Sequence, residues 1–518
     1  MLTLETLILV SALVSGVVVA VLQNLKWLRV TQRVHYLPGE VARIERLWLD
    51  VRPVGVLWWL LASALAILSV QGATWWGGQW WGWFAVAAPL LILPTPWTLS
   101  FAGTTSALAW TDRAKRAYVG MFVLQVMVGA LTVWLLGPAG VLIPLLLGAY
   151  IADVALAGLW YVERSLSMKF VKDAKRKLGR VKPTVVAITG SYGKTSTKGY
   201  VAHLVGATHQ VVASPASFNN LMGLSKTIND HVVSGTEVFV AEMGMNAEGR
   251  IRELGTWFPP DIAAITVIGE AHMERLGSQE AIFRAKAEIT EQAATVVLAI
   301  DQPELRALAD KCERLGKRVI RVSATGMPAD VSLNGEDQTL RYGPDAAPQP
   351  VEVPPFGHGV NIAVALGIAY ALDVSPEQAL AKLGELPVAA HRAEVAESGG
   401  VAIIDDTYNS NPVGALNAVT AGAQLATLRD GPFVVVTPGM VELGPVQFQR
   451  NSELAAAVIE CGGTLMIVGR TNKKALLEGA QGVAGTFPDR AGAVTSALHA
   501  AGNQGVILYE NDLPDHYP

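Results

Sequence analysis

The residues with the clearest capacity for chemistry lie in one short loop, Gly190-Ser191-Tyr192-Gly193-Lys194-Thr195-Ser196. Glycines let backbone N–H groups approach phosphate oxygens at the positive end of a following helix. In such a loop a lysine, here Lys194, reaches the β- and γ-phosphates of a nucleotide, and the hydroxyl of Thr195 is placed to hold Mg²⁺. The spacing departs from the general Walker pattern, because Ile188 stands where that pattern has its first glycine. The loop predicts ATP chemistry, and an ordinary strand-to-helix turn is the alternative.

The elements around this loop read as an open α/β sheet. The apolar, β-branched run 184–188 predicts a buried strand, and 197–205 predicts the helix after the loop. Two further predicted strands, 237–241 and 262–268, lead into Glu242 and toward His272. Ligands of such sheets bind at the carboxyl ends of the strands, so both side chains are expected beside a metal-nucleotide. Taken alone, a glutamate such as Glu242 is more often a helix-capping or solvated carboxylate, and a histidine such as His272 is more often a satisfied polar residue.

The first third of the 518-residue chain has the composition of a membrane domain. No charged residue occurs at positions 6–25, 53–111 or 117–152, and a spanning helix needs roughly 20 apolar residues. We therefore expect about five transmembrane helices, near 5–23, 54–72, 80–98, 118–137 and 139–161. The net charge of −4 gives no reason to expect nucleic acid as a partner.

Basic residues set the expected orientation of these spans. Lysines and arginines gather between the first and second spans, between the third and fourth, and after the fifth. By the positive-inside rule these segments are cytoplasmic. The chain is therefore expected to cross a membrane with its N-terminus outside and everything after the fifth span in the cytoplasm. The tryptophans between positions 75 and 83 are then expected at the outer interface.

Three more residues have two possible readings each. Asp153 lies inside the fifth apolar stretch, where a carboxylate is either functional or close to the inner headgroups. Cys312 and Cys461, the two cysteines, fall in the expected cytoplasmic part, which favours free, buried thiols over a disulfide.

Several motifs beyond the loop resemble those of one family. In chain order, the residues concerned are 190–195, Phe218-Asn219-Asn220-Leu221-Met222-Gly223, 242–244, 268–274, 283–289, His391-Arg392, 405–412 and 439–444. Together they look like the Mur ligases, and the run Asp405-Asp406-Thr407-Tyr408-Asn409-Ser410-Asn411-Pro412 is most similar to the MurF type. The likeness covers about residues 183–475.

The resemblance implies a role for each matching position. Glu242 and Thr195 would bind one Mg²⁺, and His272 with a carbamylated Lys286 would bind a second. A carbamate turns a repelling cation into an oxygen ligand, which hard cations prefer; without the resemblance, Lys286 reads as an ordinary surface lysine. Catalysis would rest on Lys194, Lys286 and His272. The remaining implied contacts are nucleotide binding by Gly190, Ser191, Gly193, Lys194, Thr195, Ser196, Asn361, Arg392, Asp406, Tyr408 and Asn409, and acceptor binding by Asn219 and Asn220.

The resemblance also implies the organisation of the chain. We expect a membrane domain at 1–167, a central P-loop ATPase domain with a parallel sheet at 168–388, and a C-terminal Rossmann-like α/β domain at 389–518 that closes over the nucleotide. The expected fold class is an α-helical membrane domain followed by α/β domains. MurF-type enzymes have a small N-terminal domain that grips the UDP-sugar, and the spans stand in its place. Of the residues that usually lie near the adenine in this family, only Asn361 is clearly present here. The tail 509–517 lacks the Lys-Gly-Ser-Arg ending expected of MurF.

The expected function is a membrane-anchored, ATP- and Mg²⁺-dependent amide ligase acting through an acyl phosphate. It would join a peptidoglycan-precursor or other peptide carboxylate to an amino acid or dipeptide such as D-alanyl-D-alanine. The lipid bilayer, and other membrane enzymes of cell-wall synthesis, are the further expected partners. Two alternatives remain open, a membrane-bound poly-γ-glutamate synthase-like ligase and an ATP-switched transport or scaffold protein. The run 405–412 counts against the first of them.

Overall fold

The computed structural model describes residues 3–75, 78–96, 99–100, 108–352, 359–387, 394–408, 410–514 and 516–518. The chain divides into two compact units. Unit 1 comprises Met1–Leu166 together with Leu513–Pro518, and unit 2 comprises Ser167–Asp512. Each unit is described below by itself.

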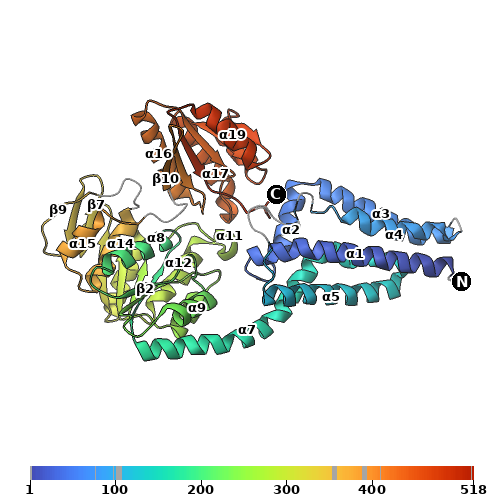
Figure 1. Cartoon of the computed structure of the whole chain (residues 1–518), viewed down its shortest axis with the longest axis horizontal. Helices are drawn as coiled ribbons and strands as arrows, with labels where there is room; N and C mark the ends of the chain where they lie inside the picture. The colour runs from blue at the N-terminus through green and yellow to red at the C-terminus, as the bar shows by residue number, and fades with distance from the viewer. Residues whose placement is uncertain are drawn as a thin grey trace. The chain divides into compact units, whose positions relative to one another are not determined.

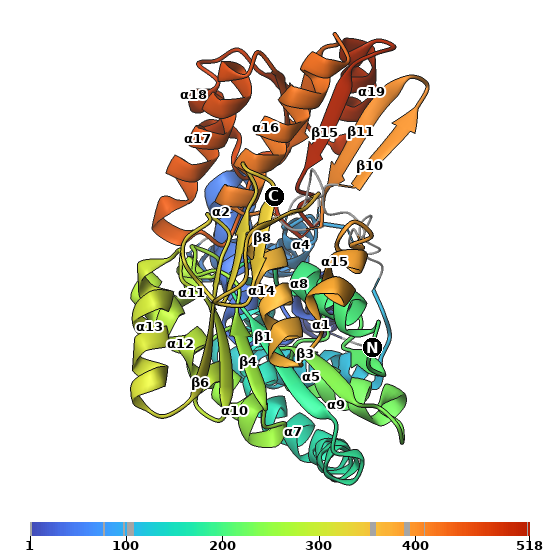
Figure 2. The same ribbon diagram turned by 90° about the vertical axis from the view of Figure 1, so that its left-hand side faces the viewer.

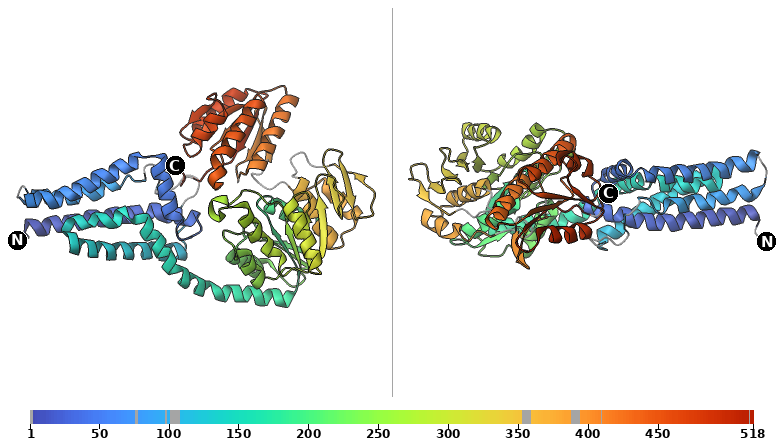
Figure 3. Two further views of the ribbon diagram at one scale, coloured as in Figure 1. Left: turned by 180° about the vertical axis from the view of Figure 1, so that it is seen from behind. Right: turned by 90° about the horizontal axis from the view of Figure 1, so that it is seen from above.

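Unit 1 is helical. Its elements are α1 (Leu4–Arg33), α2 (Glu40–Val51), α3 (Val54–Trp75), η1 (Gln79–Gly82), α4 (Trp83–Ile92), α5 (Asp112–Leu136), η2 (Gly137–Leu142), α6 (Ile143–Leu146) and the first half of α7 (Gly148–Val181). Helix α4 packs against both α1 and α3, and α1 also packs against α5, so the long helices run side by side (Figure 1, Figure 3). Three segments of the described residues are long and apolar enough to cross a membrane, namely Leu4–Arg33, Val54–Gly72 and Asp112–Leu146.

The two other expected spans have a different form. The segment expected at 80–98 is helical only to Ile92, and that helix contains Pro89. The segment expected at 139–161 is interrupted, because Pro138 and Pro144 begin two short helices before α7 starts at Gly148. Proline lacks the N–H that a helix interior needs, which explains the breaks. Helix α7 then continues to Val181, through the basic segment that follows the fifth apolar stretch.

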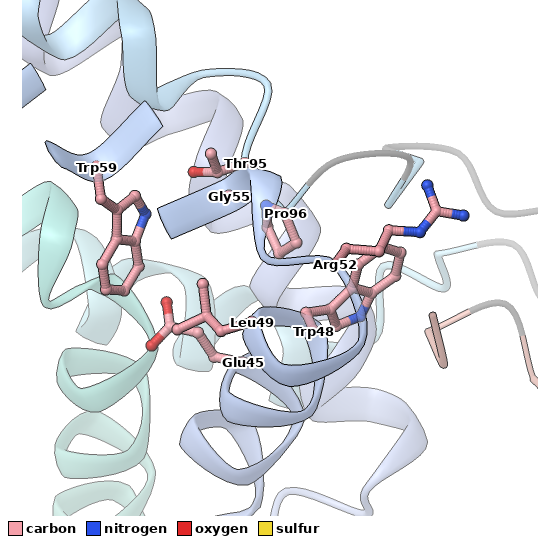
Figure 4. A pocket seen from close by; sticks show the side chains of 8 residues that line it. All are labelled: Glu45, Trp48, Leu49, Arg52, Gly55, Trp59, Thr95 and Pro96. Atoms are coloured by element: carbon pink, nitrogen blue, oxygen red, sulfur yellow. The ribbon is translucent and has the colours of Figure 1, made fainter. Parts of the chain in front are cut away.

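The C-terminal residues 513–518 complete unit 1. The indole Nε1 of Trp48, on α2, donates a hydrogen bond to the backbone oxygen of His516 at 2.8 Å. Tyr517 packs against the apolar cluster that holds Trp27, Ile44 and Trp48. A small pocket beside Trp48, lined by Glu45, Trp48, Leu49, Arg52, Gly55, Trp59, Thr95 and Pro96, also belongs to unit 1 alone (Figure 4).

Asp153 has a structural contact in unit 1. Its two carboxylate oxygens accept hydrogen bonds from the backbone N–H groups of Val41, at 3.2 Å, and Ala42, at 2.9 Å. These are free N–H groups of the first turn of α2, where a carboxylate satisfies orphan donors and the helix dipole. The carboxylate therefore caps α2.

The first part of unit 2 is built on a nine-stranded sheet in the order β2-β3-β1-β4-β5-β6-β7-β8-β9. Its strands are β1 (Thr184–Thr189), β2 (Val211–Ala213), β3 (Val238–Glu242), β4 (Ile262–Ile265), β5 (Thr295–Ala299), β6 (Arg318–Ser323), β7 (Val331–Asn334), β8 (Thr339–Tyr342) and β9 (Gln349–Pro350). Strands β1 to β7 pair in parallel, and β8 and β9 pair antiparallel.

Helices cover both faces of this sheet (Figure 2). They are α8 (Lys194–Val205), α9 (Leu221–His231), α10 (Arg250–Trp257), α11 (Met273–Leu276), α12 (Gln279–Ala287), η3 (Glu288–Thr290), α13 (Pro303–Arg314), α14 (Gly359–Ala371) and α15 (Pro376–Leu383). The central strands are buried throughout, with β3 fully covered. Parallel strands that are covered on both faces read as continuous apolar runs, which is why their sequences do not alternate.

The second part of unit 2 has a six-stranded sheet in the order β10-β11-β15-β12-β13-β14. Its elements are β10 (Glu394–Ser398), β11 (Val401–Asp406), α16 (Pro412–Leu428), β12 (Phe433–Thr437), η4 (Gly444–Val446), α17 (Gln447–Glu460), β13 (Thr464–Val468), α18 (Lys473–Gly479), β14 (Gly485–Phe487), α19 (Arg490–Ala501) and β15 (Val506–Glu510). All pairings are parallel except β10 with β11. Helices α16 and α17 share one apolar cluster with the sheet and α19 shares the other. Cys312 is buried and Cys461 is exposed, both as free thiols, so the expectation that both are buried is wrong for Cys461.

Candidate active site

The phosphate loop follows directly from β1. The strand ends at Thr189, and α8 begins at Lys194 after Gly193, whose φ of 77° favours glycine. A Cβ atom at Gly193 would lie 2.0 Å from Oδ1 of Asn361, so the predicted nucleotide-binding residue Asn361 packs directly on the loop. The Nζ of Lys194 donates to the backbone oxygen of Gly190 at 2.7 Å. The loop thus has the strand, turn and helix N-terminus that phosphate binding requires.

Neighbouring segments fix the shape of this loop. The hydroxyl of Ser191 donates to the backbone oxygen of Gly269 at 3.0 Å and accepts from its N–H at 2.9 Å. The hydroxyl of Thr266 donates to the backbone oxygen of Tyr192 at 2.5 Å. Both partners lie at or after the end of β4, so adjacent strands hold the loop in place.

Glu242 is the carboxylate nearest to the loop. It ends β3, opposite Ile188 on β1, and is 1% exposed. Its Oε2 accepts from the Thr195 hydroxyl and from the Nζ of Lys198, each at 3.0 Å. Burial opposes ionisation of this carboxyl, yet the ammonium groups of Lys198 and Lys194 outweigh burial and hold the pKa of Glu242 below its ordinary value. The structure therefore brings the predicted ligands Thr195 and Glu242 together as a neutral hydroxyl and an ionised carboxylate.

The two asparagines predicted to bind the acceptor have different surroundings. Asn219 donates from Nδ2 to Oε1 of Glu242 at 3.1 Å, and its amide leaves no room for a side chain at Gly244. Asn220 instead accepts from the N–H of Gly223 at 2.9 Å and is the N-cap of α9. Asn219 therefore joins Thr195 and Lys198 in a cluster of side chains around Glu242, the Glu242 cluster. Asn220 instead caps a helix.

Lys286 lies on α12 and is 1% exposed, so the reading as a surface lysine is wrong. Burial, together with the nearby charge of Lys194, lowers the pKa of its amine well below the ordinary value. Within the described residues no hydrogen bond or ion pair is formed by its Nζ. A buried amine of this kind is most stable in its neutral form, because a buried ammonium without a partner is costly.

His272 stands at the N-terminus of α11 with a left-handed backbone, φ 67°. Its Nδ1 lies 3.1 Å from Oε2 of Glu442, a residue of the second sheet domain. Burial lowers the pKa of His272 and the Glu442 carboxylate acts in the opposite direction, while Lys286 and Lys194 lower it further. Lys194 thus acts electrostatically on Glu242, His272 and Lys286 alike, which places these predicted residues in one cluster.

The fit of this cluster to divalent cations can be tested from its donors. No group of three or more His, Cys, Asp or Glu side chains that could hold a metal occurs within the described residues. A hydroxyl and an ionised carboxylate 3.0 Å apart, at Thr195 and Glu242, do suit Mg²⁺, which prefers oxygen ligands and retains several waters. The neutral amine of Lys286 becomes an oxygen donor only after carbamylation. The residues present therefore fit Mg²⁺ with few protein ligands.

The second domain approaches the cluster through a set of ion pairs. Arg450 donates from Nε and Nη2 to the two oxygens of Glu270, at 2.8 Å and 2.5 Å. Arg275 donates to Oε1 of Glu442 at 3.2 Å. Bidentate pairs of this type fix orientation as well as distance. The domains are therefore held together beside His272.

The predicted residues of the 405–412 run form a separate polar group. Asp406 pairs in register with Glu510 at the ends of β11 and β15, and the hydroxyl of Ser410 donates to Glu510. Burial and the neighbouring Asp406 carboxylate raise the pKa of Glu510 well above its ordinary value. Tyr408 is half exposed. The predicted residues Arg392 and Asn409 lie outside the described residues.

Sequence reasoning missed several members of the site. Lys198 lies four residues after Lys194 and therefore on the same side of α8, a spacing that could have revealed it. Glu442 lies inside the 439–444 motif, but the motif assigned it no role. Arg450 and Glu510 carried no local signal, because each acts on a partner 100 residues or more away in the sequence.

Comparison with known proteins shows what these elements resemble. Residues 188–359 match the model of the Mur ligase middle domain. The UDP-N-acetylmuramoyl-tripeptide–D-alanyl-D-alanine ligase of Mycobacterium bovis is 30% identical over 356 residues, which cover 64% of this chain and 68% of that protein. The chain belongs to the Mur ligase family. This family consists of ATP-dependent ligases that form carbon–nitrogen bonds, and the protein is such a ligase.

Solved structures agree with this fold. MurF from Acinetobacter baumannii superposes with a TM-score of 0.58 at 23% identity and covers 66% of this chain and 77% of its own. The MurF ligase of Thermotoga maritima, solved in complex with ADP, gives a TM-score of 0.57 at 24% identity, covering 66% and 80%. The Mur ligase portion is therefore MurF-like in architecture, and the helical unit is an additional region.

Proposed function

We propose that this Mur ligase is anchored in a membrane and joins a peptidoglycan-precursor carboxylate to an amine such as D-alanyl-D-alanine at the expense of ATP. The observation that carries the proposal is the phosphate loop with Lys194, beside which the Glu242 carboxylate accepts hydrogen bonds from Thr195 and Lys198. The substrates are those of the similar UDP-N-acetylmuramoyl-tripeptide–D-alanyl-D-alanine ligases.

The proposed reaction has two steps. The substrate carboxylate attacks the γ-phosphorus of ATP, forming an acyl phosphate and releasing ADP; the amine then attacks the acyl carbon, and phosphate leaves as the amide forms and the amine loses a proton. The main task in phosphoryl transfer is to offset negative charge around the γ-phosphoryl group. Lys194 does so from the loop, where its ammonium would exchange the backbone oxygen of Gly190 for phosphate oxygens.

Two Mg²⁺ ions are part of the proposed site. Thr195 and Glu242 would hold one Mg²⁺, and His272 with a carbamylated Lys286 would hold a second. When bound, Mg²⁺ supplies positive charge to the phosphate oxygens. Lys286 supports carbamylation because its amine is buried and its pKa is lowered, and a neutral amine is the form that reacts with carbon dioxide.

Membrane anchoring is supported by the surface of unit 1. The most apolar 18-residue stretch of each long apolar segment is mostly exposed. Only 33% of that stretch is buried in Leu4–Arg33, 22% in Val54–Gly72 and 11% in Asp112–Leu146. Leu60, Met127 and Trp134 are each more than 60% exposed. Soluble proteins seldom leave apolar patches of this extent open to water. We therefore place unit 1 in the inner membrane of a bacterium, with the ligase portion in the cytoplasm.

The test uses the full-length protein in lipid nanodiscs. ATP, UDP-N-acetylmuramoyl-tripeptide and D-alanyl-D-alanine are supplied together and with each omitted in turn, and mass spectrometry detects the amide while phosphate release is followed in parallel. We expect product and phosphate in equal amounts only when all three are present. ATP turnover that continues without the carboxylate or the amine would favour an ATP-driven switch and would overturn the ligase proposal.

A further inference from the structure

A groove of about 700 Å³ lies between α5 and α7 in unit 1. Its volume falls within the roughly 300–1,000 Å³ that is usual for small-molecule sites. The lining residues are Lys115, Arg116, Val119, Gly120, Val123 and Leu124 on α5, and Val154, Ala155, Gly158 and Leu159 on α7. The walls are therefore apolar except at one end.

Each wall of this groove contains a glycine. A Cβ atom at Gly158 would meet nothing within 4 Å, so a larger side chain there would occupy groove volume without a clash at its first carbon. On the other wall, a Cβ atom at Gly120 would lie 3.2 Å from Leu159. From Arg116 to Leu124 the groove runs about 12 Å along α5 at 1.5 Å per residue. This length is close to the depth of one leaflet, about half of the ~30 Å hydrocarbon core.

The charged end of the groove favours an anion. Lys115 and its partner Asp112 are 60% and 82% exposed, so their ion pair is weak. Arg116 uses Nε and Nη2 to bind Glu163, which engages only part of its five N–H donors. The segments 112–116 and 163–164 together contain four basic and two acidic residues. Basic pockets between transmembrane helices on the cytoplasmic side are suited to phosphate headgroups.

We propose that this groove binds one inner-leaflet lipid, with its apolar chain between α5 and α7 and its phosphate headgroup at Lys115 and Arg116. The proposal rests on the membrane placement proposed above, because only that placement puts the basic end at the inner headgroups. It does not depend on the ligase chemistry, since no residue of the phosphate loop or of the Glu242 cluster lines the groove.

The test measures lipid binding to the detergent-solubilised full-length protein by native mass spectrometry. Phosphatidylglycerol and phosphatidylcholine with identical chains are titrated in parallel, and inorganic phosphate is added as a competitor. We expect one phosphatidylglycerol molecule to bind at least about fivefold more tightly than phosphatidylcholine, the effect of one nearby basic side chain. Inorganic phosphate should not displace it, because the chain contributes to binding.

Two variants and one control locate the site. Gly158→Leu should fill the groove and weaken both lipids, whereas Val126→Leu, an exposed position of α5 outside the groove, should leave both unchanged. Lys115→Gln should remove most of the preference for phosphatidylglycerol. Equal affinity for the two lipids, or wild-type binding by Gly158→Leu, would overturn the proposal. If the protein instead stays in aqueous solution without detergent, the membrane placement itself fails, and that outcome is distinguishable from a membrane protein that lacks this site.

Discussion

Nδ1 of His272 and Oε2 of Glu442 lie 3.1 Å apart, although 170 residues separate them in the sequence. Both residues have left-handed backbones, with φ of 67° and 64°, a conformation that is uncommon without glycine and often kept at functional sites. An ionised Glu442 can only accept, so Nδ1 of His272 carries the proton and Nε2 is left as an acceptor or metal ligand. The second domain therefore sets the tautomer of a residue in the first.

Replacement of Glu442 tests this relationship. Glu442→Gln should lower kcat/KM by about 10- to 100-fold, the usual effect of losing the partner that orients a ligating histidine. The Mg²⁺ concentration needed for half-maximal rate should rise as well, which a titration at saturating ATP would measure. Glu460→Gln, at the exposed end of α17, is the matched control. An unchanged Mg²⁺ requirement would show that Glu442 does not act through His272.

Lys194→Ala should abolish product formation, because this ammonium is the loop's positive charge at the γ-phosphate. Membrane insertion should be unaffected, since Lys194 belongs to unit 2. Product can be quantified by mass spectrometry, and insertion by resistance to alkaline extraction. Ligation near the wild-type rate would remove the assignment of the phosphate loop.

Lys286→Ala should be inactive, and short-chain carboxylic acids should restore part of the activity by placing an oxygen donor where the carbamate would lie. Rates at increasing acetate concentration measure this rescue. Lys311→Ala, an exposed lysine on α13, should be fully active and insensitive to acetate. Full activity of Lys286→Ala without any additive would exclude the carbamate.

Glu510→Gln should change the pH dependence of stability. Burial beside Asp406 raises the pKa of Glu510, so the folded state holds a proton that the unfolded state releases at lower pH. Stability is therefore lost as pH rises from the ordinary glutamate pKa through the raised one. The amide mimics the protonated form, so thermal unfolding should show a higher Tm than wild type at pH 8 and a difference that shrinks toward pH 5. Parallel Tm profiles across this range would contradict the assignment.

Local patterns were sufficient to predict much of the ligase core. The β-branched run before Gly190 predicts β1, and the motifs place Glu242 at the end of a strand, where the structure has it. His272 instead lies seven residues after the end of β4, at the N-terminus of α11. The Mur ligase family followed from the same motifs and is confirmed by the comparisons. Each of these features depends on residues that are close together in the sequence, so one sequence was enough to predict them.

Contacts between distant segments could not be predicted in this way. Nothing near Glu270 indicates Arg450, and nothing near Asp406 indicates that the buried Glu510 lies opposite it. Hydropathy alone also does not reveal helix breaks. The apolar stretch 139–161 has the composition of one span, although the helix is interrupted at Pro144. Asp153 caps α2 although more than 100 residues separate it from that helix in the sequence. The burial of Lys286 depends on the packing of the whole domain around it.

Residues 513–518 belong to the helical unit, although they follow the entire ligase portion in the sequence. A ribosome makes Trp48 early and His516 only after every strand of both sheets. Domains generally fold as units during synthesis, with the N-terminal one first. In this chain the indole of Trp48 can donate its hydrogen bond to His516 only after the ligase portion has been translated. The contacts that residues 513–518 make in the helical unit can therefore form only after the ligase portion has been synthesised.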